Sequence, residues 1–209
     1  RHPNRYGILH ANVGKIPTKE QTIGEIALLK GYATGHFGKW HLGTLSNTIN
    51  DANRGKQDSP HYSPPWKNGF QTCYSTESKV PTWDPMKIPE GQKSKKFWNP
   101  TTKDQPSKFY GTHYWTETGK PIDPTSKALE GCDSKIIMDQ ALKFIETNAS
   151  NKKPFLTVIW FHAPHWPVVA GPKYQELYND RSDFEKNYWG CITALDDQVG
   201  RLTNTLEKH

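Results

Sequence analysis

Two side chains suited to ionic or acid–base chemistry stand two residues apart in GYATGHFGKWHLG, residues 31–43. The ammonium of Lys39 is a point charge with three donors, which suits an anionic oxygen. The imidazole of His41 can gain or lose a proton near neutral pH. In extended backbone this spacing points both side chains to the same side, and Gly38 lets a ligand approach the chain closely. A solvated surface Lys and His is the alternative interpretation.

A second polar motif, HAPHWP, contains two histidines, His162 and His165, at spacing i, i+3. Two histidines could bind a metal ion. However, Pro164 and Pro167 exclude a regular helix, so the spacing does not match a helical zinc motif. We expect one histidine to contact an anion and the other, His162, to be structural, with a hydrogen bond to the backbone.

Each motif follows a predicted strand. Tyr32–Phe37 precedes the first, and Phe155–Phe161 precedes the second. The second strand, FLTVIWF, is apolar throughout, which is typical of a strand covered on both faces in a parallel sheet. Parallel strands present their carboxyl ends at one edge, so we expect Lys39, His41 and His165 to share a concave surface. The Lys39 ammonium and the His165 ring should then lie within roughly 10 Å, about two strand spacings.

Helices must connect these strands. Helical periodicity or capping boxes predict them near 23–30, over 134–147 and from Ser182 onward. Tyr188, Ile192, Leu195, Val199, Leu202 and Leu206 should form the apolar stripe of the last helix. Helices that closely precede strands indicate an α/β fold. Between the strands, about 44–132 should be a long loop-rich excursion with short hairpins, which shapes a substrate pocket.

Composition narrows the class of partner. The net charge is +6, and the sequence pI is about 9.1. The basic residues are scattered, without a nucleic-acid motif, so a small anionic substrate or a polyanionic glycan fits better than nucleic acid. The 8 Trp and 9 Tyr suit carbohydrate stacking or ordinary loop packing. The chain contains no run of 18 apolar residues, so no membrane-spanning helix is expected.

The three cysteines, Cys73, Cys132 and Cys191, are far apart and include no CxxC motif. A zinc knuckle and a thioredoxin-like site are therefore not expected. One disulfide with one free thiol, or no disulfide, are both compatible with this spacing.

Several segments together resemble the sulfatase family. GYATGHFGKWHLG is similar to the second sulfatase signature, G-Y-x-T-x-x-x-G-K-W-H-L-G, and FHAPHWP resembles the histidine-bearing strand end. The opening Arg1–Arg5 resembles the stretch after the first signature. ALDDQVGRL, residues 194–202, resembles the helix before a metal-binding Asp-Asn pair. WKNGFQTCYSTESKVPTWDP resembles a segment of bacterial polysaccharide sulfatases. The resemblance covers nearly the whole chain in the same order.

The resemblance implies an alkaline-phosphatase-like α/β fold, a mostly parallel sheet with helices on both faces. It also implies hydrolysis of sulfate esters of carbohydrates or aryl compounds. A formylglycine, made from the Cys or Ser of C/S-x-P-x-R, attacks sulfur, and calcium held by acidic pairs neutralises the sulfate. Lys39 matches the lysine that contacts sulfate and the aldehyde, and His41 matches the histidine that hydrogen-bonds the formylglycine. His165 matches a sulfate-contacting histidine.

The chain departs from the family pattern in two places. It has no C/S-x-P-x-R motif and neither metal-binding acidic pair. Asp196 and Asp197 lie within a predicted helix, where a solvated face explains them better than a metal site. We therefore expect 1–209 to be part of an N-terminal catalytic domain, inactive alone, with the calcium ligands and the formylglycine outside it.

Two alternatives remain, and the compartment is a further expectation. A phosphoesterase or phosphonate hydrolase of the same superfamily would share the fold, although GKWHLG argues against it. A non-catalytic piece that binds anionic glycans would also explain the charge and the Trp content. The resemblance implies export to the periplasm or the exterior, or a lysosome-like compartment, although the chain shows no targeting signal.

Overall fold

The computed structural model describes residues 14–52, 54–90, 100 and 108–209. The motif at Arg1–Arg5 lies outside these residues. The chain divides into two units. The first comprises 1–78, 112–122 and 143–160, and the second comprises 79–111, 123–142 and 161–209.

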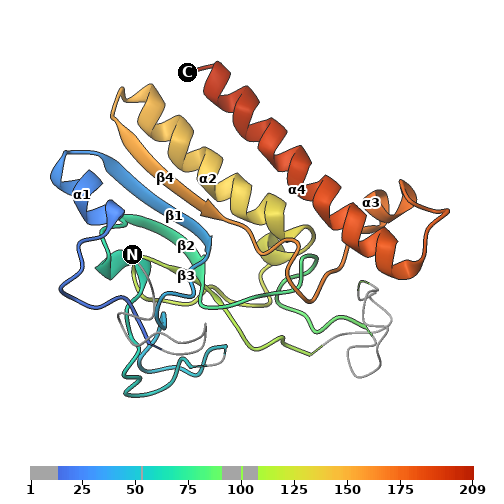
Figure 1. Cartoon of the computed structure of the whole chain (residues 1–209), viewed down its shortest axis with the longest axis horizontal. Coiled ribbons are helices and arrows are strands. Elements are labelled where there is room, and N and C mark those ends of the chain that lie inside the picture. The colour runs from blue at the N-terminus through green and yellow to red at the C-terminus, as the bar shows by residue number, and fades with distance from the viewer. Residues whose placement is uncertain (1–13, 53, 91–99, 101–107) are drawn as a thin grey trace. The chain divides into compact units, whose positions relative to one another are not determined.

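The first unit is built on a four-stranded sheet in the order β3-β2-β1-β4 (Figure 1). Its strands are β1 (Ala33–Lys39), β2 (Thr72–Thr76), β3 (Tyr114–Thr116) and β4 (Phe155–Trp160). Strand β1 pairs in parallel with both β2 and β4, while β3 runs antiparallel to β2. The expected, mostly parallel sheet is therefore present. Two of its strands, β2 and β3, come from the excursion, where the sequence indicates no strand of the main sheet.

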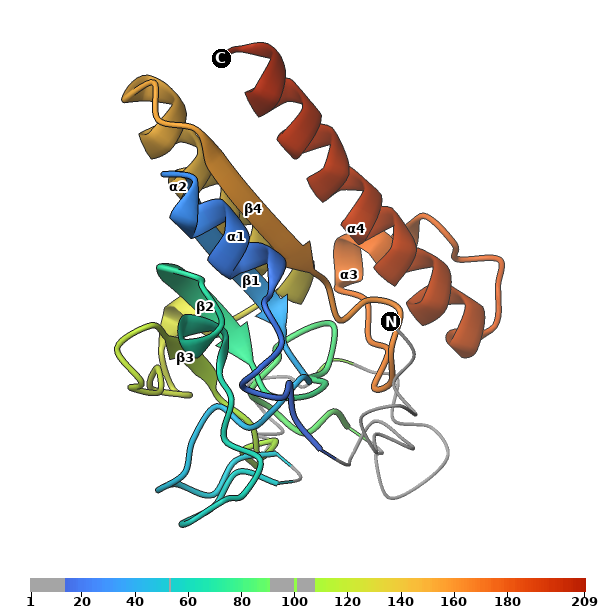
Figure 2. The same cartoon turned by 60° about the vertical axis from the view of Figure 1, so that its left-hand side comes forward.

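Helix α1 (Ile23–Leu29) begins at the capping box expected from the sequence. The hydroxyl of Thr22 accepts a hydrogen bond from Glu25 N at 3.1 Å, and the Glu25 carboxylate accepts one from Thr22 N at 2.8 Å. These reciprocal bonds satisfy two donors that a helix start otherwise leaves unpaired. The helix lies against β1 and β4 (Figure 2).

The two faces of β1 are covered by different elements. Phe37 packs on Phe144 of α2 (Asp133–Ser150), with ring centroids 5.7 Å apart. His36, one residue earlier, points to the opposite face and meets the ring of Phe70 at 5.5 Å. A Cβ added to Gly24 of α1 would also approach the Phe70 ring, at 3.1 Å. Helix α1 and the part of α2 that belongs to this unit, from Lys143 onward, thus cover opposite faces of the sheet, as expected.

Strand β4 is less buried than its apolar sequence indicates. Residues 155–159 are half-buried, and Trp160 is 42% exposed. The reason is position: β4 is the last strand in the order, and β1 is its only partner among the described strands. The expectation of a strand covered on both faces was therefore wrong for the structure described.

The second unit contains the first part of α2, the short helix α3 (Pro172–Glu176) and the long helix α4 (Asp183–Glu207). The expected capping box starts α4, since the Ser182 hydroxyl accepts from Glu185 N at 3.4 Å. The residues of the expected apolar stripe all lie on α4, but the stripe is not the buried face of the helix. Its members Ile192, Val199 and Leu206 are exposed. The buried positions of α4 are Asn187, Gly190, Cys191, Ala194, Gln198 and Thr205.

Two short 3-10 helices, Pro65–Lys67 and Lys127–Leu129, complete the regular elements of the described residues. Within the same residues, none of the helices has the length and apolar character that crossing a membrane requires.

The first prediction concerns the contact between sheet and helix. Phe144 is 7% exposed and contacts both Phe37 and Phe155. We expect Phe144→Ala to lower the free energy of unfolding by about 3–5 kcal/mol, because it removes a buried ring and leaves a cavity. Chemical denaturation measures the change, with Lys143→Ala at the exposed neighbouring position as the control. A loss below about 1 kcal/mol would contradict this packing.

Candidate functional site

The Lys39-Trp40-His41 turn is fixed by backbone pairing that continues beyond β1. Trp40 N donates to the carbonyl of Thr76, and His41 N donates to the carbonyl of Glu77, each at 2.9 Å. His41 has φ of 53°, which is in the left-handed region. The argument that Lys39 and His41 point to one side assumed extended backbone, so it does not hold at His41. A non-glycine residue in this conformation is strained and is often found at functional sites.

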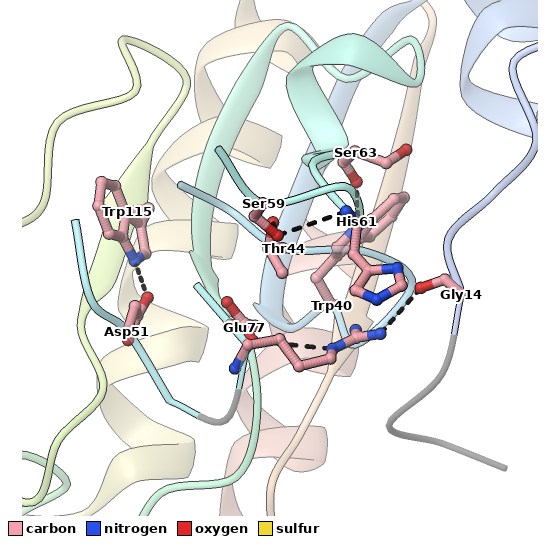
Figure 3. Close-up of polar contacts among 10 residues, drawn as sticks. Gly14, Trp40, Thr44, Asp51, Ser59, His61, Ser63, Glu77 and Trp115 are labelled. Carbon is pink, nitrogen blue, oxygen red and sulfur yellow. Dashed lines mark hydrogen bonds and ion pairs between the residues drawn. The ribbon is translucent and has the colours of Figure 1, made fainter. Parts of the chain in front are cut away.

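Trp40 anchors the middle of this turn. Its side chain is 3% exposed, and the indole N–H donates to the carbonyl of Ser63 at 2.7 Å (Figure 3). The indole also stacks on Trp160, with ring centroids 5.9 Å apart and an interplanar angle of 22°. Lys39 and His41, both half-buried, therefore flank a buried residue that is held through both its backbone and its side chain.

His36, in the same motif, has a structural role. It is fully buried among Trp40, Phe70 and Trp160, and Nδ1 lies 2.7 Å from the hydroxyl of Ser75. Burial lowers its pKa to about 3. The ring is therefore neutral near pH 7 and cannot supply positive charge.

The two histidines of HAPHWP, in the second unit, differ in environment. His162 is 1% exposed, and its Nδ1 lies 2.7 Å from the carboxylate of Asp133. Its structural character agrees with the expectation, but this partner is a side chain rather than the backbone. His165 is exposed, and its Nδ1 donates to the carbonyl of Trp166 at 2.7 Å. In the neutral ring this bond leaves Nε2 as the acceptor nitrogen.

Strand pairing bears on whether the two motifs meet. Because β1 and β4 are parallel, Gly38 lies opposite Trp160 in the register. The chain that continues to HAPHWP therefore leaves the sheet at the edge where Lys39 ends β1. Lys39 and His41 belong to the first unit and His165 to the second, so their convergence stays a prediction.

A buried ionic cluster beside the turn was not found from the sequence. Glu77, whose carbonyl holds His41, has a side chain that is only 1% exposed. Its carboxylate accepts from Arg54 N at 3.2 Å and lies 4.0 Å from Arg54 Nε. Burial, and secondly the nearby Asp51, raise the pKa of Glu77 to about 7, although Arg54 opposes this.

Asp51 extends this cluster to β3. Its carboxylate accepts a hydrogen bond from His113 N at 3.0 Å and another from the indole N–H of Trp115 (Figure 3). Asp51 and Arg54 lie in the excursion, where the local sequence carries no periodic signal. Only Glu77 lies in a segment that resembles the family, TES, and nothing in that segment indicates its partners.

The cysteines supply neither a disulfide nor a reactive thiol. Cys73, Cys132 and Cys191 are free and buried. Burial is the main cause that raises the pKa of all three thiols, for Cys132 to about 11 and for Cys191 to about 12. Because the thiolate is the nucleophilic form, none of them is activated.

The described residues also do not fit a metal ion. Across 14–52, 54–90, 100 and 108–209, no three His, Cys, Asp or Glu side chains come together as ligands. Asp196 and Asp197 are exposed on α4, and Asp197 accepts from the Tyr174 hydroxyl at 2.7 Å. This supports the interpretation of the pair as a solvated helix face rather than as ligands of calcium.

The mostly parallel sheet and its helices make this an α/β protein. The Lys-x-His turn at the end of β1 is a candidate anion site at the carboxyl edge of the sheet. The family model described as Sulfatase matches residues 1–209, and the chain belongs to that family. The alkaline-phosphatase-like fold is accordingly confirmed by the solved sulfatases that it resembles.

Individual relatives agree with this assignment. An uncharacterised sulfatase, YdeN, of Escherichia coli K12 is 25% identical over 100% of this chain and 34% of its own length. An ulvan-active sulfatase of Formosa agariphila is 24% identical over 92% of this chain and 33% of its own length. The crystal structure of Ps i-CgsB in complex with k-i-k-neocarrahexaose is 26% identical, with a TM-score of 0.65 over 94% of this chain and 38% of that one. This chain spans about a third of the length of these curated relatives.

The second prediction follows from the buried Glu77. Its pKa is raised from 4.5 to about 7, so the folded state binds a proton that the unfolded state has released. Stability from this group is fully present below pH 4.5 and is lost as pH rises through 7. We expect that loss, of the order of 3 kcal/mol, to be absent in Glu77→Gln. Denaturation at several pH values measures it.

Glu146→Gln, at an exposed position of α2, is the matched control for Glu77→Gln. It should leave the pH dependence of the wild type unchanged, because an exposed carboxylate is screened by solvent. If Glu77→Gln retained the wild-type dependence between pH 4.5 and 7, Glu77 would not be the titrating group.

Proposed function

We propose that the protein containing this chain hydrolyses sulfate esters of carbohydrates or aryl compounds. The observation that carries the proposal is the Lys39-Trp40-His41 turn, fixed at the carboxyl edge of the sheet in a chain that belongs to the sulfatase family. Because the chain covers about a third of its relatives, the activity belongs to the complete protein.

In this proposal the ammonium of Lys39 and the ring of His165 bind the sulfate. Negative charge develops on the sulfate oxygens in the transition state, and preorganised cations and donors stabilise it most effectively where water is excluded. The buried Trp40 supports this role, since it fixes the backbone of its neighbour Lys39 before the substrate arrives. His41 hydrogen-bonds the nucleophilic group and assists release of the product.

Calcium and formylglycine, the groups that the family resemblance implies, belong to parts of the protein outside this chain in our proposal. When bound, calcium would supply positive charge to the sulfate, and formylglycine would supply the nucleophile. Lys39, His41 and His165 are the residues of this chain that would face them. Each belongs to a motif that matches the family pattern.

The substrate is proposed to be a sulfated carbohydrate. The relatives include an ulvan-active sulfatase and a protein crystallised with k-i-k-neocarrahexaose. The net charge of +6 favours polyanions in general. Export to the periplasm or the exterior, or a lysosome-like compartment, would place the enzyme where such glycans occur.

The third prediction tests Lys39 in the complete protein. We expect Lys39→Ala to lower kcat/KM for an aryl sulfate by at least about a hundredfold, because one preorganised contact to transition-state charge is removed. Lys39→Arg should rescue activity poorly, since a planar fork does not replace a point charge. Release of sulfate measures both.

Lys30→Ala, at the exposed end of α1, is the control and should retain wild-type rates. Near-normal turnover by Lys39→Ala would refute the proposed role of Lys39. Faster turnover of the matching phosphate ester than of the sulfate ester by the wild type would instead favour a phosphoesterase of the same superfamily.

The fourth prediction is geometric. In a crystal structure of the complete protein, we expect the Lys39 ammonium and the His165 ring within roughly 10 Å, about two strand spacings, with His41 on the same concave surface. The parallel register of β1 and β4 supports this expectation. If the two motifs lay at opposite edges of the sheet, the assignment of His165 would be wrong.

A further inference from the structure

The loop that follows the Lys-Trp-His turn lines an open cavity of about 530 Å³. The residues that line it are Asn50, Asp51, Ala52, Arg54, Gly55, Lys56, Ser59, Pro60 and His61. The loop closes on itself, because Thr44 N donates to the carbonyl of His61 at 2.8 Å and Ser63 N donates to the carbonyl of Thr44 at 3.1 Å. The carbonyl of Ser63 also accepts the hydrogen bond of the Trp40 indole, and this bond connects the loop around the cavity to the turn.

Arg54 is the unusual side chain in the cavity wall. It is 8% exposed, and its Nη1 donates to the carbonyl of Gly14 at 2.8 Å (Figure 3). Nε and Nη2 are buried and find no acceptor in the part of the chain that the structure describes. These two nitrogens form one edge of the guanidinium, the edge that binds a carboxylate or a sulfate through two parallel hydrogen bonds.

Glu77 does not satisfy this edge. Glu77 Oε1 forms an ion pair with Nε at 4.0 Å, which is too long for a hydrogen bond, and Glu77 Oε2 is buried without a hydrogen-bond partner among the described residues. Burial and the nearby Asp51 raise the pKa of Glu77 to about 7, so near neutral pH the carboxyl is partly protonated and neutralises Arg54 only in part. Asp51 itself is engaged with Trp115 and His113 N.

Two other lining groups, Lys56 and His61, favour an anion as well, whereas the carboxylate of Asp51, held by Trp115 and His113 N, opposes one. Lys56 is exposed and His61 is half-buried, and both add positive or proton-donating groups to the lining. Ser59 and Asn50 offer polar groups that suit sugar hydroxyls. A buried charged donor without an acceptor is rare in native proteins, and a bound ion or ligand is one of its explanations.

We propose that this cavity binds a second anionic group of the substrate, a sulfate ester or a carboxylate on a sugar unit beside the one whose sulfate is cleaved. Arg54 would take the anion through Nε and Nη2 after a small rotation of the guanidinium, with Lys56 and His61 at the rim. The volume lies within the range of small-ligand sites. The inference rests on the proposed function and deepens it, since it makes the preferred substrate a polyanionic glycan rather than a simple aryl sulfate.

The fifth prediction compares substrates in the complete protein. Arg54→Gln and Lys56→Gln should each raise KM for an oligosaccharide with sulfate on neighbouring units, by about tenfold for Arg54, the usual effect of one charge-assisted hydrogen bond. The value of kcat should hardly change, and KM for 4-nitrophenyl sulfate should stay at the wild-type value. A sulfated oligosaccharide whose neighbouring unit carries a uronate instead of sulfate shows which anion the cavity prefers.

Lys30→Gln is the control for loss of one surface charge. Lys56 is exposed, so Lys56→Gln tests the cavity even if Arg54→Gln fails to fold. Equal losses on the small and the large substrate, or unchanged KM for the large one, would overturn the proposal. If the wild type cleaved no sulfate ester, the proposed function would fail separately. Calorimetric binding of the oligosaccharide that Arg54→Gln weakens would then still support the cavity.

Discussion

Strand β1 is hydrogen-bonded along both edges, to β2 and to β4, and the position of the functional turn depends on that pairing. The β2 ladder does not stop at Lys39, because Trp40 and His41 continue it to Thr76 and Glu77. A turn that leaves a sheet usually gains mobility, but here the backbone stays bonded through His41. Strain at His41 is therefore tolerated, since pairing and the buried indole of Trp40 hold the conformation on both sides.

Burying such a strand requires that its polar groups be paired. The hydroxyl of Thr34 donates to the carbonyl of Gly69 at 2.7 Å, and Nδ1 of His36 is hydrogen-bonded to the hydroxyl of Ser75. Nε2 of His36 is the exception, since it is buried without a hydrogen-bond partner among the described residues. Gly35 allows close packing, because an added Cβ would lie 2.7 Å from the ring of Phe37 and 3.2 Å from that of Phe144. Polar residues can therefore be buried in this strand because neighbouring segments supply hydrogen-bond partners. The same hydrogen bonds help to fix the position of the strand.

Local signals in the sequence were reliable, and signals that depend on distant partners were not. The capping boxes at Thr22 and Ser182 were predicted because both members lie three residues apart. Both strands before the polar motifs were predicted to within two residues. The second was recognised from an apolar run that Pro154 opens, and the first from its position directly after a predicted helix. The left-handed His41 and the partners of Glu77 could not be predicted, because long-range pairing sets them. The exposure of the stripe on α4 could not be predicted either, since periodicity identifies an apolar face but not which neighbour covers it.

The buried charges of Glu77 and Arg54 beside the turn are not the arrangement that would give the fold its greatest stability. Two carboxylates, Glu77 and Asp51, stand close together around Gly55, where an added Cβ would lie 2.8 Å from the Glu77 carboxylate. Replacing a buried ion pair by well-packed apolar side chains often leaves a protein equally stable or more stable. The charges instead join the backbone that holds His41 to the loop that carries Arg54. Binding an anion at Arg54 would compensate a buried cation that Glu77, 4.0 Å from Nε, pairs with but does not hydrogen-bond through that nitrogen.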